Sequence, residues 1–319
     1  MFIYFLKVAL QNSFSKIIFS MKKRLIKLYL QLKYLPFHLF CKKPHILSFD
    51  ETISNILSRK SLARFGDGEI RMVLDLNEEI GFQKKCEKLS RRLQEVLKTD
   101  NENVLICLPN TFGLNFNFNT DSQIFWLGFN FNYAARFCRF LNIPNERKFG
   151  NALITRFYMP FKDKSEVAHK VAQLKKIWNN KEIVIIEGEA SKLGIGNDLF
   201  NNSKSLTRII CPAKNAFDKY NEILDAAKRF GKNKLILIAL GPTATVLAHD
   251  LAVEGYWALD IGHIDVEYMW YLNNDKQKNQ ISGKAVNEAV NKPEIKGSFK
   301  EEVKAEDPVY KESILCVIK

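Results

Sequence analysis

One stretch of the chain, residues 234–267, has the apolar pattern of a strand, a helix and a second strand. Leu235 to Leu240 is apolar without interruption, as is typical of a strand that is covered on both faces of a parallel sheet. Pro242 then fits the first turn of a helix, where its missing N–H group loses no partner. Apolar residues at helical spacing lead to Gly255, and Tyr256 to Ile261 forms the second predicted strand. The stretch therefore predicts a right-handed βαβ unit whose first strand is central in the sheet.

The same kinds of pattern recur on both sides of this unit. Short apolar runs predict further strands at residues 61–64, 104–108, 152–158, 182–186 and 208–212, and an edge strand within 310–318. Apolar residues three or four apart predict helices at 49–60, 86–97, 124–141, 167–178 and 215–230. This order indicates an α/β fold with a mainly parallel central sheet and helices on both faces. We expect a single catalytic domain at residues 49–271, a basic amphipathic segment at 1–48 and a polar segment at 272–319.

The composition is that of a soluble globular protein, with 319 residues of which 46% are apolar and 26% are charged. The formal net charge is +13, but residues 1–49 hold nine Lys or Arg and no acid, which leaves +4 for the rest of the chain. This nearly balanced body gives no reason to expect nucleic-acid binding.

The six cysteines are scattered without a Cys-x-x-Cys pair, so neither a zinc site nor a disulfide framework is indicated. Such a pattern favours a reducing cytoplasm.

Residues 1–45 mix large apolar side chains with Lys and Arg. Lys7 and the polar stretch 11–16 break the first apolar run before it reaches the roughly 20 residues of a membrane-spanning helix, and no small-residue cleavage site follows. Leucines from Leu25 to Leu35 recur at helical spacing among basic residues, so we predict a helix that contacts the anionic inner face of the cell membrane. The alternative is a helix that packs on the protein's own body. Met21 is an alternative start of the chain.

The first candidate site follows the predicted strand 61–64, in the sequence Arg64-Phe-Gly-Asp-Gly-Glu69. We interpret Gly-Asp-Gly-Glu as a tight turn, because its glycines let the backbone adopt unusual conformations and let a ligand come close. Asp67 and Glu69 then offer hard oxygen ligands to Mg²⁺ or Mn²⁺, and the diphosphate of a substrate completes the coordination shell. The alternative is an ordinary surface turn.

A second cluster of ionisable residues follows the second predicted strand and consists of Asp260, His263, Asp265 and Glu267. If residues 263–267 are extended, the last three side chains share one face, because side chains of a strand alternate with a period of two. Polar groups at the end of a parallel strand suit an active-site edge, and a solvated loop rim is the alternative.

The loop after the predicted strand 182–186 contains Gly194 and Gly196 but has Leu199 where the third glycine of a dinucleotide fingerprint belongs. We therefore exclude a true NAD site. A mononucleotide or sugar site stays open, in which Lys192 faces phosphate and Asn197 or Asp198 accepts from sugar hydroxyls.

Two further places are candidates for phosphate contacts. The turn Gly241-Pro242-Thr243 begins a helix, and the free N–H groups at a helix N-terminus bind phosphate in many α/β proteins. Arg156 ends the predicted strand 152–158, where it meets either a phosphate or a carboxylate.

Four blocks of the chain carry these motifs: Arg64–Glu69, Glu187–Glu189 with Gly194–Phe200, Cys211–Phe217, and Ala239–Thr245 with Asp260–Glu267. In this order they resemble the bacterial glycosyltransferases of the D-type (GT-D) fold, a domain formerly of unknown function that occurs in adhesin and surface-polysaccharide glycosylation loci. The resemblance implies a Rossmann-like domain, a nucleotide-sugar donor that is UDP-linked, such as UDP-glucose, and a divalent cation held by Asp67 and Glu69. Lys192 stands where the family has Arg, a change that keeps the charge but loses the bidentate geometry.

From this resemblance we predict transfer of the donor's sugar to a hydroxyl of a glycan or glycoprotein acceptor. Glu267 or Asp265 is expected to take the acceptor's proton, and His263 to contact the diphosphate or to orient the carboxylate. The other expected donor contacts are Arg64, Gly66, Arg156, Glu187, Lys192, Gly196, Asn197, Asp198, Asn215, Gly241, Pro242, Thr243 and Asp260. The alternatives are another nucleotide-dependent transferase, such as a phosphotransferase, and a non-catalytic module that binds a nucleotide sugar.

Overall fold

The computed structural model describes residues 2–142, 146–284, 289 and 308–319. The chain divides into two compact units, each built from several segments. The first unit consists of residues 1–43, 111–143 and 160–163, and the second consists of residues 44–110, 144–159 and 164–319. Each unit is described by itself.

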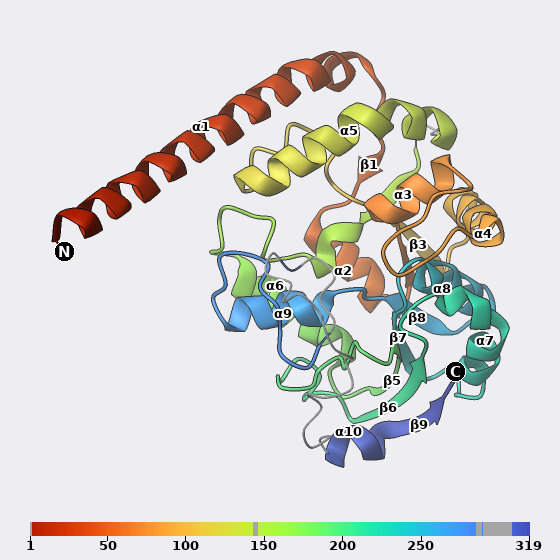
Figure 1. The fold of residues 1–319 in the computed structure, drawn as a ribbon. Helices are drawn as coiled ribbons and strands as arrows, with labels where there is room; N and C mark the ends of the chain where they lie inside the picture. Colours follow the sequence, from red (N-terminus) through yellow and green to blue (C-terminus); the bar gives the residue numbers. More distant parts are fainter. Residues whose placement is uncertain (1, 143–145, 285–288, 290–307) are drawn as a thin grey trace. The chain divides into compact units, whose positions relative to one another are not determined.

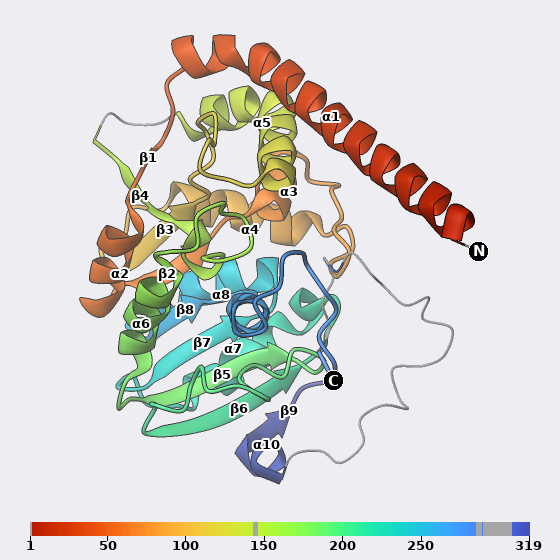
Figure 2. The ribbon, with the colours of Figure 1, turned by 90° about the vertical axis from the view of Figure 1, so that its left-hand side faces the viewer.

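The second unit contains a sheet of nine strands, all paired in parallel (Figure 2). The strands are β1 (His45–Ile46), β2 (Ser61–Arg64), β3 (Val104–Leu108), β4 (Lys148–Asn151), β5 (Glu182–Gly188), β6 (Ser205–Cys211), β7 (Leu235–Ala239), β8 (Trp257–Asp260) and β9 (Ile314–Val317). Their order in the sheet is β1-β4-β3-β2-β8-β7-β5-β6-β9. The predicted α/β fold with a mainly parallel sheet is confirmed, and β7 lies in its interior as expected.

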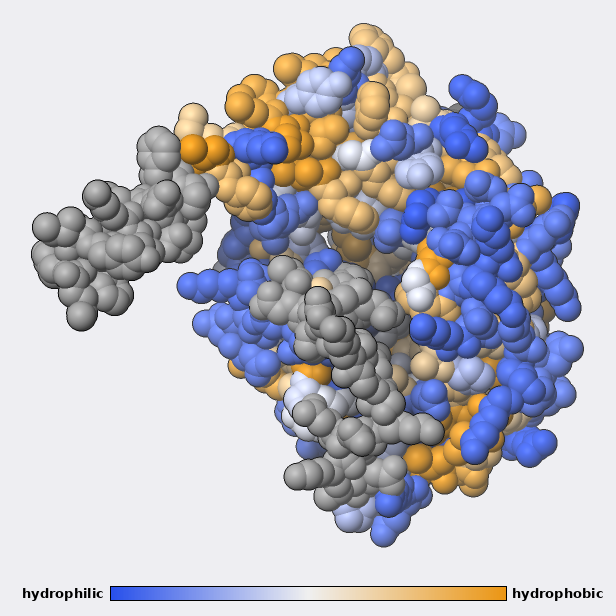
Figure 3. All heavy atoms as spheres, in the orientation of Figure 1, coloured by the Kyte–Doolittle hydropathy of each residue, from blue (hydrophilic) through white to orange (hydrophobic). Residues whose placement is uncertain are grey.

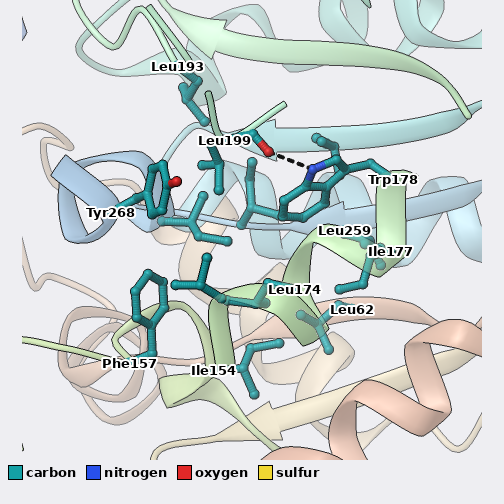
Figure 4. Close-up of a cluster of buried hydrophobic side chains, with 14 of the residues drawn as sticks. Leu62, Ile154, Phe157, Leu174, Ile177, Trp178, Leu193, Leu199, Leu259 and Tyr268 are labelled. Carbon is teal, nitrogen blue, oxygen red and sulfur yellow. Dashed lines mark hydrogen bonds between the residues drawn. The ribbon is translucent and has the colours of Figure 1, made fainter. Parts of the chain in front are cut away.

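Helices cover both faces of this sheet because its central strands are apolar on both sides. In β5, Ile183 and Ile185 pack against one face and Val184 and Ile186 against the other. The first face is covered by α2 (Phe49–Leu57), α6 (Val167–Trp178) and α9 (Ile264–Leu272), and the second by α7 (Tyr220–Lys228) and α8 (Pro242–Val253). Figure 4 shows the first core, in which Trp178 of α6 donates from Nε1 to the carbonyl oxygen of Leu199 at 2.8 Å.

The remaining helices of the second unit connect or extend these layers. They are α3 (Asp67–Leu74), α4 (Glu87–Lys98), α10 (Pro308–Ser313) and the 3₁₀ helices η1 (Ala152–Thr155) and η2 (Ala216–Lys219). β7, α8 and β8 form the predicted βαβ unit, with Pro242 in the first turn of α8 and Gly255 left-handed (φ 85°) after its end. The predicted edge strand within 310–318 is confirmed as β9, which pairs with β6.

The first unit is built on two helices, α1 (Phe2–Phe40) and α5 (Thr120–Leu141), which pack against each other (Figure 1). Tyr34 of α1 is buried, and its hydroxyl donates to the carbonyl oxygen of Phe112 at 3.1 Å. Asn119 caps α5 by accepting from the backbone N–H of Ser122. Among the described residues, no helix combines the length and the apolar character that a membrane span requires.

Three predicted local structures are wrong. Residues 152–158 do not form a strand, since β4 ends at Asn151 and η1 follows, so that Arg156 lies directly after a 3₁₀ helix. The Gly-Asp-Gly-Glu sequence is the first turn of α3 rather than a tight turn, and neither of its glycines is left-handed. Residues 264–267 belong to α9 and are not extended. Residues 285–288 and 290–307 of the predicted polar segment 272–319 lie outside the described residues.

Candidate active site

An ion pair joins the carboxyl ends of the adjacent strands β2 and β8. Arg64 donates from NH2 to Oδ1 of Asp260 at 2.8 Å and from Nε to the Asp260 carbonyl oxygen at 2.7 Å. Its NH1 group donates to Oγ1 of Thr155 at 2.7 Å, which ties η1 to the same strand ends. Burial raises the pKa of Asp260, and the charge of Arg64 opposes that rise without cancelling it. Arg64 and Asp260 hold the edge of the sheet together, and their expected contact with the donor stays a prediction.

A glycine makes room for this ion pair. Gly262 follows β8 with a φ of 44°, a left-handed conformation that other residues adopt only with strain. A Cβ atom at this position would lie 2.1 Å from NH2 of Arg64. The Asp260-Ile-Gly-His sequence is therefore set by the need to pack the backbone against a guanidinium group.

The predicted metal ligands Asp67 and Glu69 lie in the first turn of α3, which starts three residues after the end of β2. Oε2 of Glu69 accepts from the backbone N–H of Gly66 at 2.8 Å, so this carboxylate also caps the helix. Burial raises the pKa of Glu69 to about 7, and the negative charges of Asp260 and Asp67 add to the rise. The three carboxylates therefore lie within electrostatic reach of one another.

This carboxylate set fits a divalent cation. Its ligand atoms are hard oxygens, which Mg²⁺ and Mn²⁺ prefer. Burial is the main cause of the raised pKa of Glu69, and the nearby negative charges that add to it are ones that a cation would offset. No group of three or more Asp, Glu, His or Cys side chains within the described ranges is arranged to hold a metal. A cation at this turn would therefore have Asp67 and Glu69 as its carboxylate ligands, and other oxygens would complete its shell.

The N-terminus of α9 brings a second group of predicted residues together. His263 precedes the helix, and its Nδ1 lies 2.7 Å from NH2 of Arg156. Since a guanidinium group can only donate, Nδ1 accepts, and the ring proton of neutral His263 is on Nε2. Glu267, one turn further along α9, has its Oε2 atom 3.9 Å from NH1 of Arg156. His263 and Glu267 thus share a face through the spacing of a helix, not through that of a strand.

Glu267 itself is fully buried. Its Oε1 atom accepts from the backbone N–H groups of Tyr158, at 2.8 Å, and Met159, at 2.5 Å. These bonds fix the segment that follows Arg156. The predicted role of Glu267 as a general base stays a prediction, since a base must reach the acceptor's hydroxyl and this carboxylate is buried.

Asp265 faces away from His263 and Glu267 and binds the glycine loop. Its Oδ1 atom accepts from the backbone N–H of Gly194 at 2.8 Å and from Nδ2 of Asn197 at 2.7 Å. Oδ2 pairs with the ammonium group of Lys284, and both side chains of this pair are buried. Asp265 therefore holds the loop in place, and the base role predicted for it stays a prediction. Lys284 lies in a polar, Lys-rich stretch and carried no signal of its own in the sequence.

A second buried ion pair holds the same loop from the side of the sheet. Glu187, at the end of β5, pairs with NH1 of Arg208 on β6 and accepts from the backbone N–H of Leu193 at 2.7 Å. NH2 of Arg208 donates to the carbonyl oxygen of Leu193 at 2.8 Å. Burial raises the pKa of Glu187, although Arg208 opposes the shift. Glu187 was predicted as a donor contact, and the sequence gave no indication of its partner Arg208.

The remaining predicted residues of the loop are partly engaged within the protein. Oδ1 of Asn197 accepts from the backbone N–H of Leu199, so both polar ends of this amide are used. Asp198 is exposed and pairs with Lys175 at 2.7 Å and with the Tyr268 hydroxyl at 2.6 Å. Figure 4 shows Tyr268 beside the loop residues Leu193 and Leu199. Lys192 and Gly196 have positive φ angles of 46° and 76°, as the tight loop requires.

The predicted phosphate turn at the start of α8 is covered by Phe82. Gly241 has a φ of 55°, and a Cβ atom there would lie 2.1 Å from the Phe82 ring. Asn215, predicted as a donor contact, holds this cover: its backbone N–H donates to the Phe82 carbonyl oxygen at 2.9 Å and its Oδ1 accepts from the Lys84 N–H at 2.8 Å. Phe82 carried no signal of its own in the sequence.

The threonines of this turn face inward. Thr243 and Thr245 are fully buried. Thr245 donates to the Arg64 carbonyl oxygen at 2.8 Å, which links α8 to the end of β2. The turn is thus attached to the end of β2, beside the Arg64–Asp260 ion pair, although its hydroxyls do not point to solvent.

Comparison with known proteins agrees with this architecture. Residues 62–289 match the family described as Glycosyltransferase GT-D fold. Over 241 residues the chain is 39% identical to the probable glycosyl transferase Gly of Streptococcus gordonii and 36% identical to the glycosyltransferase GlyD of Streptococcus pneumoniae serotype 4. The matched region is 75% of this chain but only 35% and 29% of these two proteins, so the chain spans about a third of the length of the curated relatives it matches.

Two solved structures have the same fold. One is described as the highly conserved domain of unknown function 1792 with a distinct glycosyltransferase fold; it has a TM-score of 0.77 and 34% identity, over 91% of this chain and 100% of that chain. The other is a glycosyltransferase from Streptococcus sanguinis, with a TM-score of 0.76 and 34% identity, over 87% of this chain and 100% of that chain. The family match over residues 62–289 and these two structures lead to one conclusion: the chain belongs to the GT-D family of glycosyltransferases.

Proposed function

We propose that this protein transfers a sugar from a nucleotide-sugar donor, UDP-linked such as UDP-glucose, to a hydroxyl of a glycan or glycoprotein acceptor, with the help of Mn²⁺ or Mg²⁺. Family membership supports the reaction class. One observation supports the location of the site: the Arg64–Asp260 ion pair joins the ends of β2 and β8, after which α3 and α9 begin. Two helix N-termini, one with a pair of carboxylates and one with a histidine, therefore lie at the same sheet edge.

Asp67 and Glu69 would hold the cation. A bound divalent cation neutralises charge on the departing nucleoside diphosphate. Because Oε2 of Glu69 caps α3 through the Gly66 N–H, we assign the cation to its other oxygen, Oε1, and to the carboxylate of Asp67.

His263 and Arg156 suit an anionic ligand. Arg156 donates to Nδ1 of His263, so the proton of a neutral ring is on Nε2, and an N–H group of this kind suits a diphosphate oxygen. A neutral histidine with this tautomer can donate to a diphosphate oxygen but cannot act as a base through Nε2. We therefore place His263 at the diphosphate and give Glu267 the role of fixing the segment that carries Arg156.

The glycine loop is proposed to bind the nucleotide or the sugar through its backbone. Asp265–Lys284 and Glu187–Arg208 hold the loop from two sides, so its N–H groups are oriented before any ligand arrives. Preorganised donors lose less free energy on binding than mobile ones.

A titration of the full chain with UDP, with and without Mn²⁺, tests the metal assignment. We expect Mn²⁺ to strengthen UDP binding in the wild type, and Asp67→Asn to abolish this increase. Asp50→Asn is the matched control, because Asp50 occupies the first turn of another helix, α2, and is exposed. UDP binding that ignores Mn²⁺, or an Asp67→Asn variant that behaves like the control, would overturn the assignment.

A turnover assay separates the proposed reaction from the alternatives. Release of UDP from a panel of UDP-sugars, compared with release of ADP from ATP, distinguishes a glycosyltransferase from a phosphotransferase. We expect UDP release that requires the cation and Asp67. A protein that binds UDP-sugars without any turnover, in the wild type as in the variants, would be the binding module.

A further inference from the structure

One side of α1 exposes a continuous row of large apolar side chains. We call it the outer stripe, and it consists of Ile18, Met21, Leu25, Leu28, Leu32 and Leu39. These residues recur every three, four or seven positions, so they lie along one side of the helix. Each has between 53% and 65% of its surface exposed. Isolated exposed leucines are ordinary in soluble proteins, but a row of this length marks an interaction surface.

The opposite side of α1 already has a partner in the first unit. Tyr34 is only 1% exposed, and a methyl group of Leu30 lies 4.0 Å from the position where Gly128 of α5 would carry a Cβ atom. Lys23 pairs with Asp121 at the start of α5. These inner residues occupy the side of the helix away from the outer stripe, so packing on α5 leaves the stripe uncovered within this unit.

The charges around the outer stripe have a single sign. Lys22 and Lys33 flank it on one side and Arg24 flanks it on the other, and all three are exposed. Residues 1–49 contain no Asp or Glu. Figure 3 shows hydrophobic residues gathered over α1 and α5 with charged residues among them. An apolar stripe between basic flanks is the surface of a helix that lies in the plane of a membrane interface, with its apolar side in the acyl region and its cations at the headgroups.

We propose that the outer stripe of α1 binds the surface of an anionic lipid bilayer. Apolar side chains provide the contact with the acyl region, and the basic flanks select negatively charged headgroups. No part of this proposal depends on the sugar-transfer reaction, and no bilayer crossing is involved.

A second copy of the chain is the competing occupant. The stripe has the spacing of the a and d positions of a coiled coil, which would favour helix pairing. Stable coiled coils also carry opposite charges at the flanking positions, however, whereas a second copy would bring Lys22, Arg24 and Lys33 beside the same cations. Pro36 additionally lies inside the helix, where it removes a backbone hydrogen bond. The charges therefore favour an anionic lipid surface over self-association.

Flotation of residues 1–319 with lipid vesicles tests the proposal. Vesicles of phosphatidylcholine are compared with vesicles that also contain phosphatidylglycerol, at low and high salt. Two triple variants are used: Leu25→Gln with Leu28→Gln and Leu32→Gln removes the apolar contact, and Lys22→Gln with Arg24→Gln and Lys33→Gln removes the charges. The matched control replaces three exposed lysines of the second unit, Lys88, Lys148 and Lys176, by Gln.

We expect binding to the anionic vesicles only, weakened by salt. Each basic residue near the surface contributes about fivefold, so the charge variant should bind on the order of a hundredfold more weakly, while the control binds like the wild type. The leucine variant should also lose binding. Equal binding to both kinds of vesicle, or equal losses in the control, would overturn the proposal.

The same variants decide between lipid and a second copy. Light scattering after size exclusion measures the mass in solution, and thermal melting confirms that the variants are folded. If the wild type is a dimer that the leucine variant converts to monomer, and vesicles are not bound, the stripe is an interface between copies and the lipid proposal is wrong.

Discussion

Arg64 and Asp260 lie 196 residues apart in the chain and form an ion pair at 2.8 Å, with their side chains 14% and 6% exposed. The pair connects the ends of two neighbouring parallel strands, and the helices that follow these strands carry Asp67 and His263. Residues that resemble donor contacts in a sequence motif can therefore serve the site by fixing its frame.

Replacement of Arg64 by Met should destabilise the protein strongly. It leaves the buried carboxylate of Asp260 without its partner, a change that costs about 3–5 kcal/mol in comparable pairs. Urea denaturation measures the loss in the free energy of unfolding. Lys204→Met is the control, because Lys204 forms an exposed pair with Glu182 and should cost less than about 1 kcal/mol. Similar losses in both variants would show that the buried Arg64–Asp260 pair stabilises the fold no more than an exposed pair.

Gly262→Ala should destabilise the protein more than a Gly→Ala replacement whose only effect is backbone strain. Gly262 and Gly196 both have positive φ angles, but an added Cβ meets Arg64 at position 262 and nothing within 4 Å at position 196. Gly196→Ala should cost about 1–2 kcal/mol for the left-handed backbone. Gly262→Ala should cost more, and should also lower sugar transfer because it displaces Arg64. Thermal melting and UDP release check both points, and equal melting temperatures would contradict the expectation.

Asp250 should make the free energy of unfolding of the second unit fall at acidic pH. It accepts from Arg92 and His249, each at 2.7 Å, and from the Tyr220 hydroxyl. Burial alone would raise the pKa of Asp250, but these hydrogen bonds and the charge of Arg92 outweigh it and lower the pKa. A lowered pKa in the folded state stabilises the fold above the unfolded pKa of about 3.9, and this contribution is lost as the pH falls through the lowered value.

Asp250→Asn should therefore reduce the free energy of unfolding by about 2 kcal/mol at neutral pH. It should also flatten the fall in stability below about pH 4. Urea denaturation at a series of pH values measures both effects. Asp225→Asn is the control, since Asp225 is exposed on the neighbouring helix α7. If the free energy of unfolding of the Asp250 variant falls below pH 4 as steeply as that of the wild type, this prediction is wrong.

His263→Ala should impair catalysis without unfolding the protein. If Nε2–H of His263 donates to the departing diphosphate, its loss should slow sugar transfer on the order of a hundredfold, as for the loss of one donor to developing charge. UDP release gives the rate, and circular dichroism verifies the fold. His169→Ala is the control, because His169 is an exposed residue of α6. Wild-type turnover in the His263 variant would remove this residue from the site.

The strands of the core were predictable from sequence because their signal is local. β5 and β7 are apolar without interruption, since both faces of the sheet are covered, and Gly-Pro fixes the start of α8. β4, with the sequence Lys-Phe-Gly-Asn, carries no such signal. It is a strand because β3 and β1 lie on either side of it, and the neighbouring apolar residues 152–155 form η1 instead.

The site was predictable only in part, for a related reason. The motifs located Asp67, His263 and the glycine loop, because these residue types indicate a binding site without knowledge of their partners in the fold. They could not reveal that Glu187 is paired with Arg208 or Asp265 with Lys284, because these pairings arise only when β6 and the residues after α9 pack against the loop. The error at residues 263–267 has another origin: alternating apolar and polar residues suggest a strand, but α9 is buried on most sides, so the alternation does not reflect one exposed face.

The pairing of β2 with β8 also sets a waiting time during protein synthesis. The ends of these strands are separated by 196 residues, and ribosomes add about 5–20 residues per second, so β2 waits on the order of 10–40 s for its neighbour. Throughout that interval one edge of β2 has no strand to pair with, and unpaired edges promote aggregation. Slow translation of the codons between the two strands should therefore prolong the period in which the nascent chain depends on chaperones.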